Sequence, residues 1–179
     1  MPNVTLVPWA PEHLPLLIAA DAPEMTRYIG GPEGEEAVRR RHDRYLRSRA
    51  DRSAWMYAIE ADGEPTGGIG FWPVEHDGEP AYETGWNVLP RWQGHGVARQ
   101  ALLALIRLLD EQAPPRARLY AYPSVENAAS NALCRTTGFA ALGERDFPFR
   151  GTVLRTRVWA LDLPATTPVS GADLPRSAR

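Results

Sequence analysis

The chain has 179 residues, a length typical of one domain, and its 44% hydrophobic and 23% charged residues are typical of a folded, soluble protein. A net charge of -2 gives no reason to expect a nucleic acid partner, and the absence of an 18-residue apolar run predicts no membrane span. One cysteine excludes an internal disulfide, and four scattered histidines show no ligand spacing, so we expect no metal and a cytoplasmic location.

Turn residues and apolar periodicity predict a chain of alternating strands and helices. Two Asp-Gly pairs, at 62–63 and 77–78, lie between strand-like runs and predict hairpins. The Gly- and Pro-rich segment 21–34 is expected to be a loop. In chain order we expect a strand over 4–9, helices over 10–20 and 35–49, three strands over 55–90, a turn and a helix ending near 110, a strand over 116–124, a helix over 127–138, and strands over 139–149 and 152–163.

The C-terminal segment differs in composition from the rest of the chain. Residues 164–179 show no apolar periodicity, so we expect one folded domain over 1–163 followed by a disordered tail. All 20 basic residues are arginine, a bias that suits a GC-rich bacterial coding sequence. Without lysine the chain cannot form a Walker-type phosphate loop.

The stretch RWQGHGVA, residues 91–98, indicates an anion site. Gly94 and Gly96 allow successive main-chain N–H groups to point into one concavity, and the following helix places its positive dipole end behind them. A diphosphate would fit this turn. A dinucleotide-binding fingerprint fits poorly because Arg99 stands where its third glycine is needed. The alternative is a plain helix entry with flexible glycines.

RWQGHGVA resembles the Arg/Gln-x-x-Gly-x-Gly/Ala motif of the GCN5-related N-acetyltransferases (GNAT). ETGWNVLP (83–90) is similar to the strand before that motif, and NAASNALCRTTGF (127–139) to the family's second motif. TRYIGGP (26–32) and the opening VTLVPWAPEHLPLL resemble the branch that includes ribosomal-protein alanine N-acetyltransferases. The resemblance covers about residues 3–163.

The resemblance implies an α/β fold with a single seven-stranded mixed, mostly antiparallel sheet, flanked by about four helices. Its fourth and fifth strands would splay apart to admit acetyl-CoA. Pantetheine would pair with the main chain of the fourth strand, the diphosphate would lie on the amides from Gln93 to Ala98, and arginines would meet the 3′-phosphate. The alternative for His95 is a tolerated filler of the turn whose main chain alone matters. The implied cofactor-binding residues are Asn87, Val88, Leu89, Arg91, Gln93, Gly94, His95, Gly96, Val97, Ala98, Arg99, Asn127, Ser130 and Arg135.

Acyl transfer to an amine needs a base, and Glu83 is the candidate. Alternation places Glu83, Gly85 and Asn87 on one face of their strand, where Gly85 would leave room for substrate. The resemblance implies a glutamate at this position, and partial burial would raise its pKa toward neutrality. The alternative is an exposed or ion-paired strand glutamate.

The departing thiolate needs a proton donor, and here the sequence departs from the family. Many members carry a tyrosine seven residues after the motif asparagine, where this chain has Cys134. Cys134 and Ser130 are therefore candidate catalytic residues, with water or Tyr122 as substitutes for the acid. Cys134 could instead be a buried structural residue, and Asn127 could simply cap its helix.

The acceptor amine would contact aromatic and apolar side chains from the N-terminal half and the fourth strand. Some of these must belong to the core. Gly30 and Gly31 would let the segment 21–34 move as a lid. The candidate acceptor-binding residues are Met25, Tyr28, Trp72, Glu83 and Trp86.

Together these features predict transfer of an acetyl group from acetyl-CoA to a primary amine by direct attack in a ternary complex. The acceptor would be a protein N-terminus or a small-molecule amine, and the protein would be a monomer or homodimer. Two alternatives stay open. One is an aminoglycoside-like antibiotic N-acetyltransferase, and the other is a non-catalytic acyl-CoA sensor, which the missing tyrosine would permit.

Overall fold

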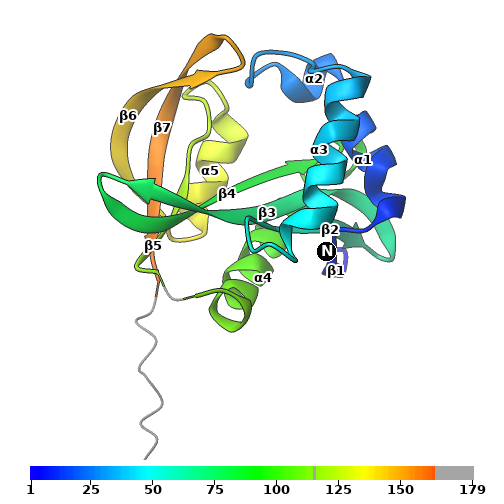
Figure 1. Ribbon diagram of the computed structural model, residues 1–179, viewed down its shortest axis with the longest axis horizontal. Helices are drawn as coiled ribbons and strands as arrows, with labels where there is room; N and C mark the ends of the chain where they lie inside the picture. Colours follow the sequence, from blue (N-terminus) through cyan, green and yellow to red (C-terminus); the bar gives the residue numbers. More distant parts are fainter. Residues whose placement is uncertain (115, 164–179) are drawn as a thin grey trace, which may run out of the picture.

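One seven-stranded mixed sheet carries helices on both faces (Figure 1). The computed structural model describes residues 1–114 and 116–163, so the expected tail lies outside the described residues. In chain order the elements are β1 (Val4–Pro8), η1 (Pro11–His13), α1 (Leu14–Ala20), α2 (Pro23–Thr26), α3 (Glu35–Ser48), β2 (Trp55–Ala61), β3 (Glu64–His76), β4 (Glu79–Val88), η2 (Pro90–Trp92), α4 (Val97–Gln112), β5 (Arg118–Ala121), α5 (Ala128–Thr136), β6 (Ala140–Phe149) and β7 (Thr152–Asp162).

The strand order β1-β2-β3-β4-β5-β7-β6 confirms the predicted fold class. All neighbours are antiparallel except β4 and β5, which pair in parallel at only two positions, Tyr82–Leu119 and Glu83–Tyr120. Beyond Glu83, β4 continues to Val88 paired with β3 on one side but no longer with β5 on the other. The two strands therefore splay apart after Glu83, as the resemblance implied.

Both predicted hairpins are present. Asp62 and Asp77 each adopt a φ of 52°, and the glycines after them have φ of 81° and 84°. Asp-Gly pairs with two positive φ values form the tight turn that matches strand twist. The second hairpin is long, and Val74 and Ala81 near its tip pack against Tyr120 of β5. The hairpin tip thus folds over β5, an arrangement that the sequence pattern did not predict.

Two hydrophobic cores lie on opposite faces of the sheet because both faces are covered by helices. Trp55 and Tyr57 of β2 belong to the larger core beneath α4, whereas Met56 between them packs with α1 and α3. Phe71 and Trp72 divide in the same way: Phe71 is buried in the larger core, and Trp72 packs against the smaller one. Neighbouring strand residues point to opposite faces, as expected.

The predicted loop 21–34 contains a short helix, α2, which brings the α-helices of the described residues to five, close to the expectation of about four. Pro23 suits the first turn of a helix, and the Thr26 hydroxyl donates a hydrogen bond to the carbonyl of Ala22. Among the described residues, none of the helices is both long and apolar enough to cross a membrane.

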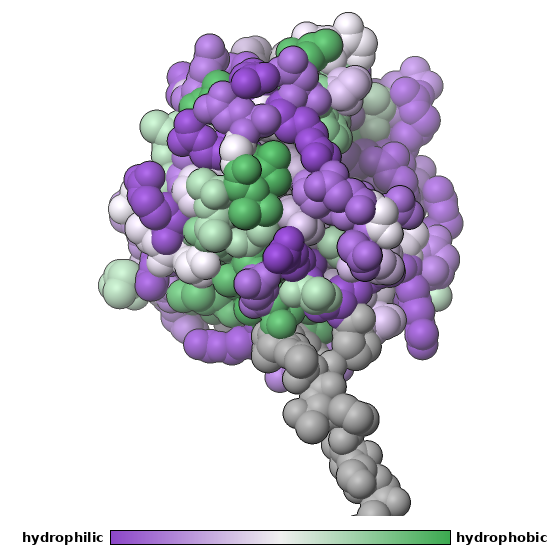
Figure 2. All heavy atoms as spheres, turned by 90° about the vertical axis from the view of Figure 1, so that its left-hand side faces the viewer, coloured by the Kyte–Doolittle hydropathy of each residue, from purple (hydrophilic) through white to green (hydrophobic). Residues whose placement is uncertain are grey.

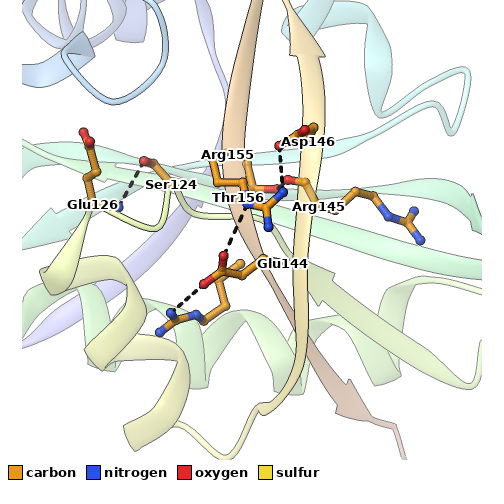
Figure 3. A network of polar contacts seen from close by, with 8 residues as sticks. Ser124, Glu126, Glu144, Arg145, Asp146, Arg155 and Thr156 are labelled. Carbon is orange, nitrogen blue, oxygen red and sulfur yellow. Dashed lines mark hydrogen bonds and ion pairs between the residues drawn. The ribbon is translucent and has the colours of Figure 1, made fainter.

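The end of the sheet formed by β6 and β7 is mostly hydrophilic at its surface, with a smaller apolar area (Figure 2). Arg155 bonds Asp146 at 3.0 Å and Glu144 at 3.3 Å on one face of β6 (Figure 3). These groups are exposed and screened by solvent, so the pairs contribute little to the stability of the fold. Arg145 points to the opposite face (Figure 3), where it bonds Asp77 at 3.1 Å.

Candidate active site

The glycine turn leaves a row of main-chain N–H groups free. Gln93 N–H donates to Pro90, and the next main-chain donor after it is Gln100, which donates to Gly96. The N–H groups of residues 94–99 therefore have no main-chain acceptor in the described part of the chain. Gly94 and Gly96 have φ of 78° and 79°, a conformation that favours glycine. The anion-binding amides thus begin at Gly94, one residue later than expected.

Helix α4 fixes this turn against the sheet. Val97, Ala101, Leu102, Leu105 and Leu109 are buried at helical spacing and belong to the larger core. The N–H groups of the first turn of α4, and the positive end of its dipole, are consequently held at the splay between β4 and β5. This combination of free amides and helix dipole fits a diphosphate.

A cleft of about 620 Å³ runs from this turn between β4 and α5. Most of the expected cofactor residues line it, but Leu89, Arg91, His95 and Arg135 do not. Arg27 also lines the cleft; it lies in the TRYIGGP stretch but was not among the expected site residues. The expected residues in the cleft wall are Met25, Tyr28, Trp86, Asn87, Val88, Gln93, Gly94, Gly96, Val97, Ala98, Arg99, Asn127 and Ser130.

Some polar groups at the β4 edge of the splay already form hydrogen bonds within the protein. Leu89 N–H donates to Thr66 of β3 at 2.8 Å, so alternation turns the main chain of Val88 toward the splay. The Val88 carbonyl accepts a 2.8 Å hydrogen bond from Gln93 Nε2. Asn87 uses its side-chain oxygen to accept from Gly68 N–H at 3.2 Å. These bonds fix the shape of the β4 edge that pantetheine would meet.

Arg91 and His95 face a second hollow of about 920 Å³ instead. Gly94, Gly96 and Trp92 line both hollows, so the glycine turn lies between them. Arg91 forms an exposed ion pair with Glu64 at 3.1 Å. Neither Arg91 nor His95 is therefore placed to meet a ligand within the cleft.

Glu83 lies where the splay begins. It is partly buried, it faces Trp72 across the β3–β4 pair and Tyr120 across the β4–β5 pair, and it does not line the cleft. Burial raises the pKa of Glu83 to about 7, although a hydrogen bond from Trp72 acts in the opposite direction. A carboxyl with this pKa can take up and release a proton at neutral pH.

Gly85 is needed for a different reason than the one expected. A Cβ at this position would lie 3.1 Å from Cη2 of the Trp72 ring. The space beside Gly85 is thus filled by the indole rather than left for substrate. Trp72 is held over β4, next to Glu83.

Asn127 caps helix α5, because its Oδ1 accepts a hydrogen bond from Ser130 N–H at 3.0 Å. Buried Asn131 supports this entry by donating to the carbonyls of Ser124 and Asn127, both at 2.8 Å. Trp159 Nε1 donates a hydrogen bond to the side-chain oxygen of Asn131. The cap is therefore rigidly placed at the cleft wall, with both Asn127 and Ser130 facing the cleft.

Cys134 is fully buried in the larger core, with 0% of its surface exposed, and does not line the cleft. Burial raises the pKa of Cys134 to about 12. This geometry favours the structural interpretation of Cys134 over a role as general acid.

Aromatic rings extend away from the Glu83 side of the sheet, beginning with Tyr122, which the sequence offered as a substitute acid, and continuing with Phe147 and Phe149, which it did not single out. The ring of Tyr122 stacks on that of Phe147 with 6.1 Å between their centroids, and the rings of Phe147 and Phe149 are tilted, with centroids 6.4 Å apart. Beyond Phe149, Arg150 of the β6–β7 turn forms a 2.8 Å ion pair with Glu33. The turn thus meets the segment that precedes α3.

Glu33 is a shared, nearly buried carboxylate. Its side chain is 12% exposed and also pairs with Arg41 of α3. Asp21 accepts hydrogen bonds from the N–H groups of Glu33 and Gly34 and so fixes the end of the expected lid. The Glu33 carboxylate is therefore balanced by two arginines.

Several solved acetyltransferases have the same fold. The Salmonella typhimurium enzyme that modifies the N-terminal serine of ribosomal protein L7/L12 is 21% identical, with a TM-score of 0.76 over 90% of this chain and 96% of that one. RimL in complex with coenzyme A is 20% identical, with a TM-score of 0.74 and coverage of 90% and 94%. The aminoglycoside acetyltransferase AAC(6′)-Ib with coenzyme A is 19% identical, with a TM-score of 0.72 and coverage of 89% and 95%.

No curated protein matches the chain significantly. A sequence model of the acetyltransferase (GNAT) domain matches residues 3–140, which is more than half of the chain. The match spans the strand pair that splays and the glycine turn. The chain therefore belongs to the GNAT family, whose members transfer an acetyl group from acetyl-CoA to an amine.

Proposed function

We propose that the protein acetylates the α-amino group of a peptide or protein, with Glu83 as the base. The observation that carries this proposal is the pKa of about 7 of a partly buried carboxyl at the start of the splay. General bases work best when their pKa lies near the working pH. Glu83 would take the proton from the attacking amine.

Acetyl-CoA would be held mainly by the main chain. The free N–H groups from Gly94 to Arg99 would bind the diphosphate, and Arg27 and Arg99 would add positive charge at the cleft wall. The rigid cap at Asn127 and Ser130 would position the pantetheine end. Acetyl-CoA supplies the activated acyl group, and the protein orients it toward Glu83.

Direct attack in a ternary complex fits the burial of Cys134 better than an acyl-enzyme does. A cysteine nucleophile must be accessible and easily ionised, whereas Cys134 is buried and its pKa is raised. Ser130 lines the cleft and keeps its hydroxyl available as a proton donor to the thiolate. We therefore assign the acid role to Ser130 or solvent.

The acceptor side favours a peptide terminus over an aminoglycoside. Aromatic side chains flank it, and among the described residues of the cleft wall Glu24 is the single carboxylate. Glu33, near the β6–β7 turn, is already paired with Arg41 and Arg150. A polycationic antibiotic would instead need several unpaired carboxylates. RimL and the serine-modifying Salmonella enzyme act on ribosomal protein L7/L12, which supports the same choice. An aminoglycoside remains the second candidate, because AAC(6′)-Ib shares the fold.

The bacterial source of a neighbour and the lysine-free composition support a bacterial enzyme. A free cysteine and dependence on acetyl-CoA support a cytoplasmic location. We propose that the enzyme acts as a monomer or homodimer on acetyl-CoA and the acceptor amine.

The test is turnover by Glu83→Gln with acetyl-CoA and a panel of peptides and aminoglycosides. We expect kcat to fall by about 100-fold at pH 8, with the Kd for CoA within twofold of wild type. Glu79→Gln, at the exposed start of the same strand, is the matched control and should keep full activity. Unchanged turnover by Glu83→Gln would remove this base, and tight CoA binding by wild type without turnover of any amine would favour the sensor.

A further inference from the structure

Three polar side chains connect the surroundings of Glu83 with the surface of the protein. The Tyr122 hydroxyl lies 2.7 Å from His76 Nδ1. On the other side of the ring, His76 Nε2 lies 3.5 Å from the Asp77 carboxylate. The His76 side chain is 8% exposed and that of Asp77 is 71% exposed. The series therefore runs from a buried position to solvent.

The folded hairpin tip creates this series. His76 ends β3, and the curl of the tip stacks its ring on Tyr120 of β5 at 3.9 Å between centroids. Tyr122 stacks on Tyr120 at 6.1 Å. Arg145 of β6 bonds Asp77 at 3.1 Å and so ties the turn to β6. Strands far apart in sequence thereby hold each member of the series in one orientation.

Glu83 adjoins the inner end of the series. Glu83 and Tyr120 are register partners on β4 and β5, and Tyr122 lies two residues further on the same face. Burial raises the pKa of Tyr122, and the charge of Glu83 is the next largest cause. The phenol therefore stays protonated, and it donates its hydrogen to His76 Nδ1 when the ring carries its own hydrogen on Nε2.

His76 is suited to pass a proton on. Burial lowers the pKa of His76, Arg145 and Arg118 lower it further, and Asp77 acts in the opposite direction. The ring is therefore neutral at pH 7. With Tyr122 donating to Nδ1, the hydrogen of the ring is assigned to Nε2, on the Asp77 side.

We propose that Tyr122, His76 and Asp77 form the route by which the proton of the acceptor amine leaves Glu83 for solvent, an inference that rests on the proposed role of Glu83. Glu83 passes its proton to the Tyr122 oxygen, directly or through water, while the Tyr122 proton moves to His76 Nδ1. The imidazolium formed beside Asp77 then loses a proton to solvent. One proton enters at Nδ1 and one leaves from Nε2, Tyr122 and Asp77 end unchanged, and exchange of the ring hydrogens with solvent returns His76 to the Nε2–H tautomer before the next turnover.

Two substitutions of His76 separate this role from a structural one. His76→Phe keeps a ring stacked on Tyr120 but removes both nitrogens, and His76→Ala leaves space for added imidazole. We expect both to lower kcat by about tenfold with saturating substrates, while KM for acetyl-CoA and acceptor stays within twofold. Imidazole should restore His76→Ala and not His76→Phe. Glu75→Gln, one residue away and exposed, is the control.

A double substitution supplies the decisive measurement. If His76 acts through Glu83, His76→Phe should cause no further loss in a Glu83→Gln background. A persistent tenfold loss there, or wild-type kcat in His76→Phe across pH 6 to 9, would overturn the relay. Failure of the proposed function is recognised separately, because Glu83→Gln alone would then keep full activity.

Discussion

The cofactor cleft and the acceptor side meet at the same splay between β4 and β5, yet they are built from different parts of the chain. The cleft presents main-chain N–H groups whose directions are set by Gly94, Gly96 and the start of α4. The proposed acceptor side presents side chains: Glu83 is the proposed base, with Trp72 and Tyr122 beside it. Binding is thus assigned to groups without a pKa near neutrality, and chemistry to a group that titrates there.

This difference implies that substitutions should separate the two sides. Changes in the cleft should weaken CoA binding equally at every pH. Changes on the acceptor side should alter turnover or stability in a pH-dependent way, or alter the KM of the acceptor alone.

The largest expected effect is on the cleft. Gly96→Val must place a β-branched residue at a φ of 79°, which costs about 1–3 kcal/mol and misdirects the free N–H groups. We expect the Kd for CoA, measured by calorimetry, to rise by about 100-fold at pH 6 and pH 8 alike. Gly63→Val is the matched control, because Gly63 has a φ of 81° and open space around it but lies in the β2–β3 turn. Equal CoA affinity in the two folded variants would contradict the assignment.

The second prediction concerns the stability cost of Glu83. Because the folded-state pKa is about 7 and the ordinary value 4.5, the folded protein binds more protons between these values. This group's contribution to the free energy of unfolding therefore falls as pH rises from 4.5 through 7. Glu83→Gln should be more stable than wild type by about 2 kcal/mol at pH 8, with little difference at pH 4.5.

Urea denaturation at the two pH values measures this difference, and Glu79→Gln serves as the exposed control. A gain in stability of the same size at both pH values would show that ionisation of Glu83 is not its cause. Combined with the loss of turnover, a gain limited to high pH would mark Glu83 as a functional residue that costs stability.

The sequence analysis predicted the cleft better than the acceptor side, and the reason is physical. A turn that needs positive φ at Gly94 and Gly96 must show glycines at fixed spacing, so its function is visible locally. The Asp-Gly hairpins were predictable for the same reason. Glu83 was predicted as the base because strand alternation and a family resemblance agreed, and its role stays a prediction.

The contacts among the residues around Glu83 could not be predicted from the sequence in this way. His76 and Tyr122 are 46 positions apart and meet only because the β3–β4 hairpin folds over β5. The Trp72 ring over Gly85 depends on the same register. Cys134 shows the converse: its position in a motif suggested a role in the cleft, but the packing of α5 on the sheet buries it. Tertiary contacts decided each case.

The third prediction tests the Trp72 contact. Gly85→Ala would place a methyl group 3.1 Å from the indole, so the ring must shift away from Glu83. We expect the acceptor KM to rise by about tenfold, equivalent to about 1.4 kcal/mol, while the Kd for CoA stays within twofold. Steady-state kinetics with the best peptide acceptor measures both sides of the comparison. A weakened CoA affinity with an unchanged acceptor KM would place Gly85 on the cofactor side instead.

The smallest effect on activity is expected at Cys134. Cys134→Ala removes a buried sulfur from the larger core without touching the cleft, so the free energy of unfolding should fall by about 1 kcal/mol. Turnover should stay within twofold of wild type from pH 6 to pH 9, because a thiol with a pKa of about 12 and no surface exposure cannot deliver a proton to the departing thiolate. A loss of turnover of tenfold or more across this pH range would instead restore Cys134 as the acid, because a general acid acts in its protonated form. The cofactor side, like the acceptor side, would then contain a group that takes part in proton transfer.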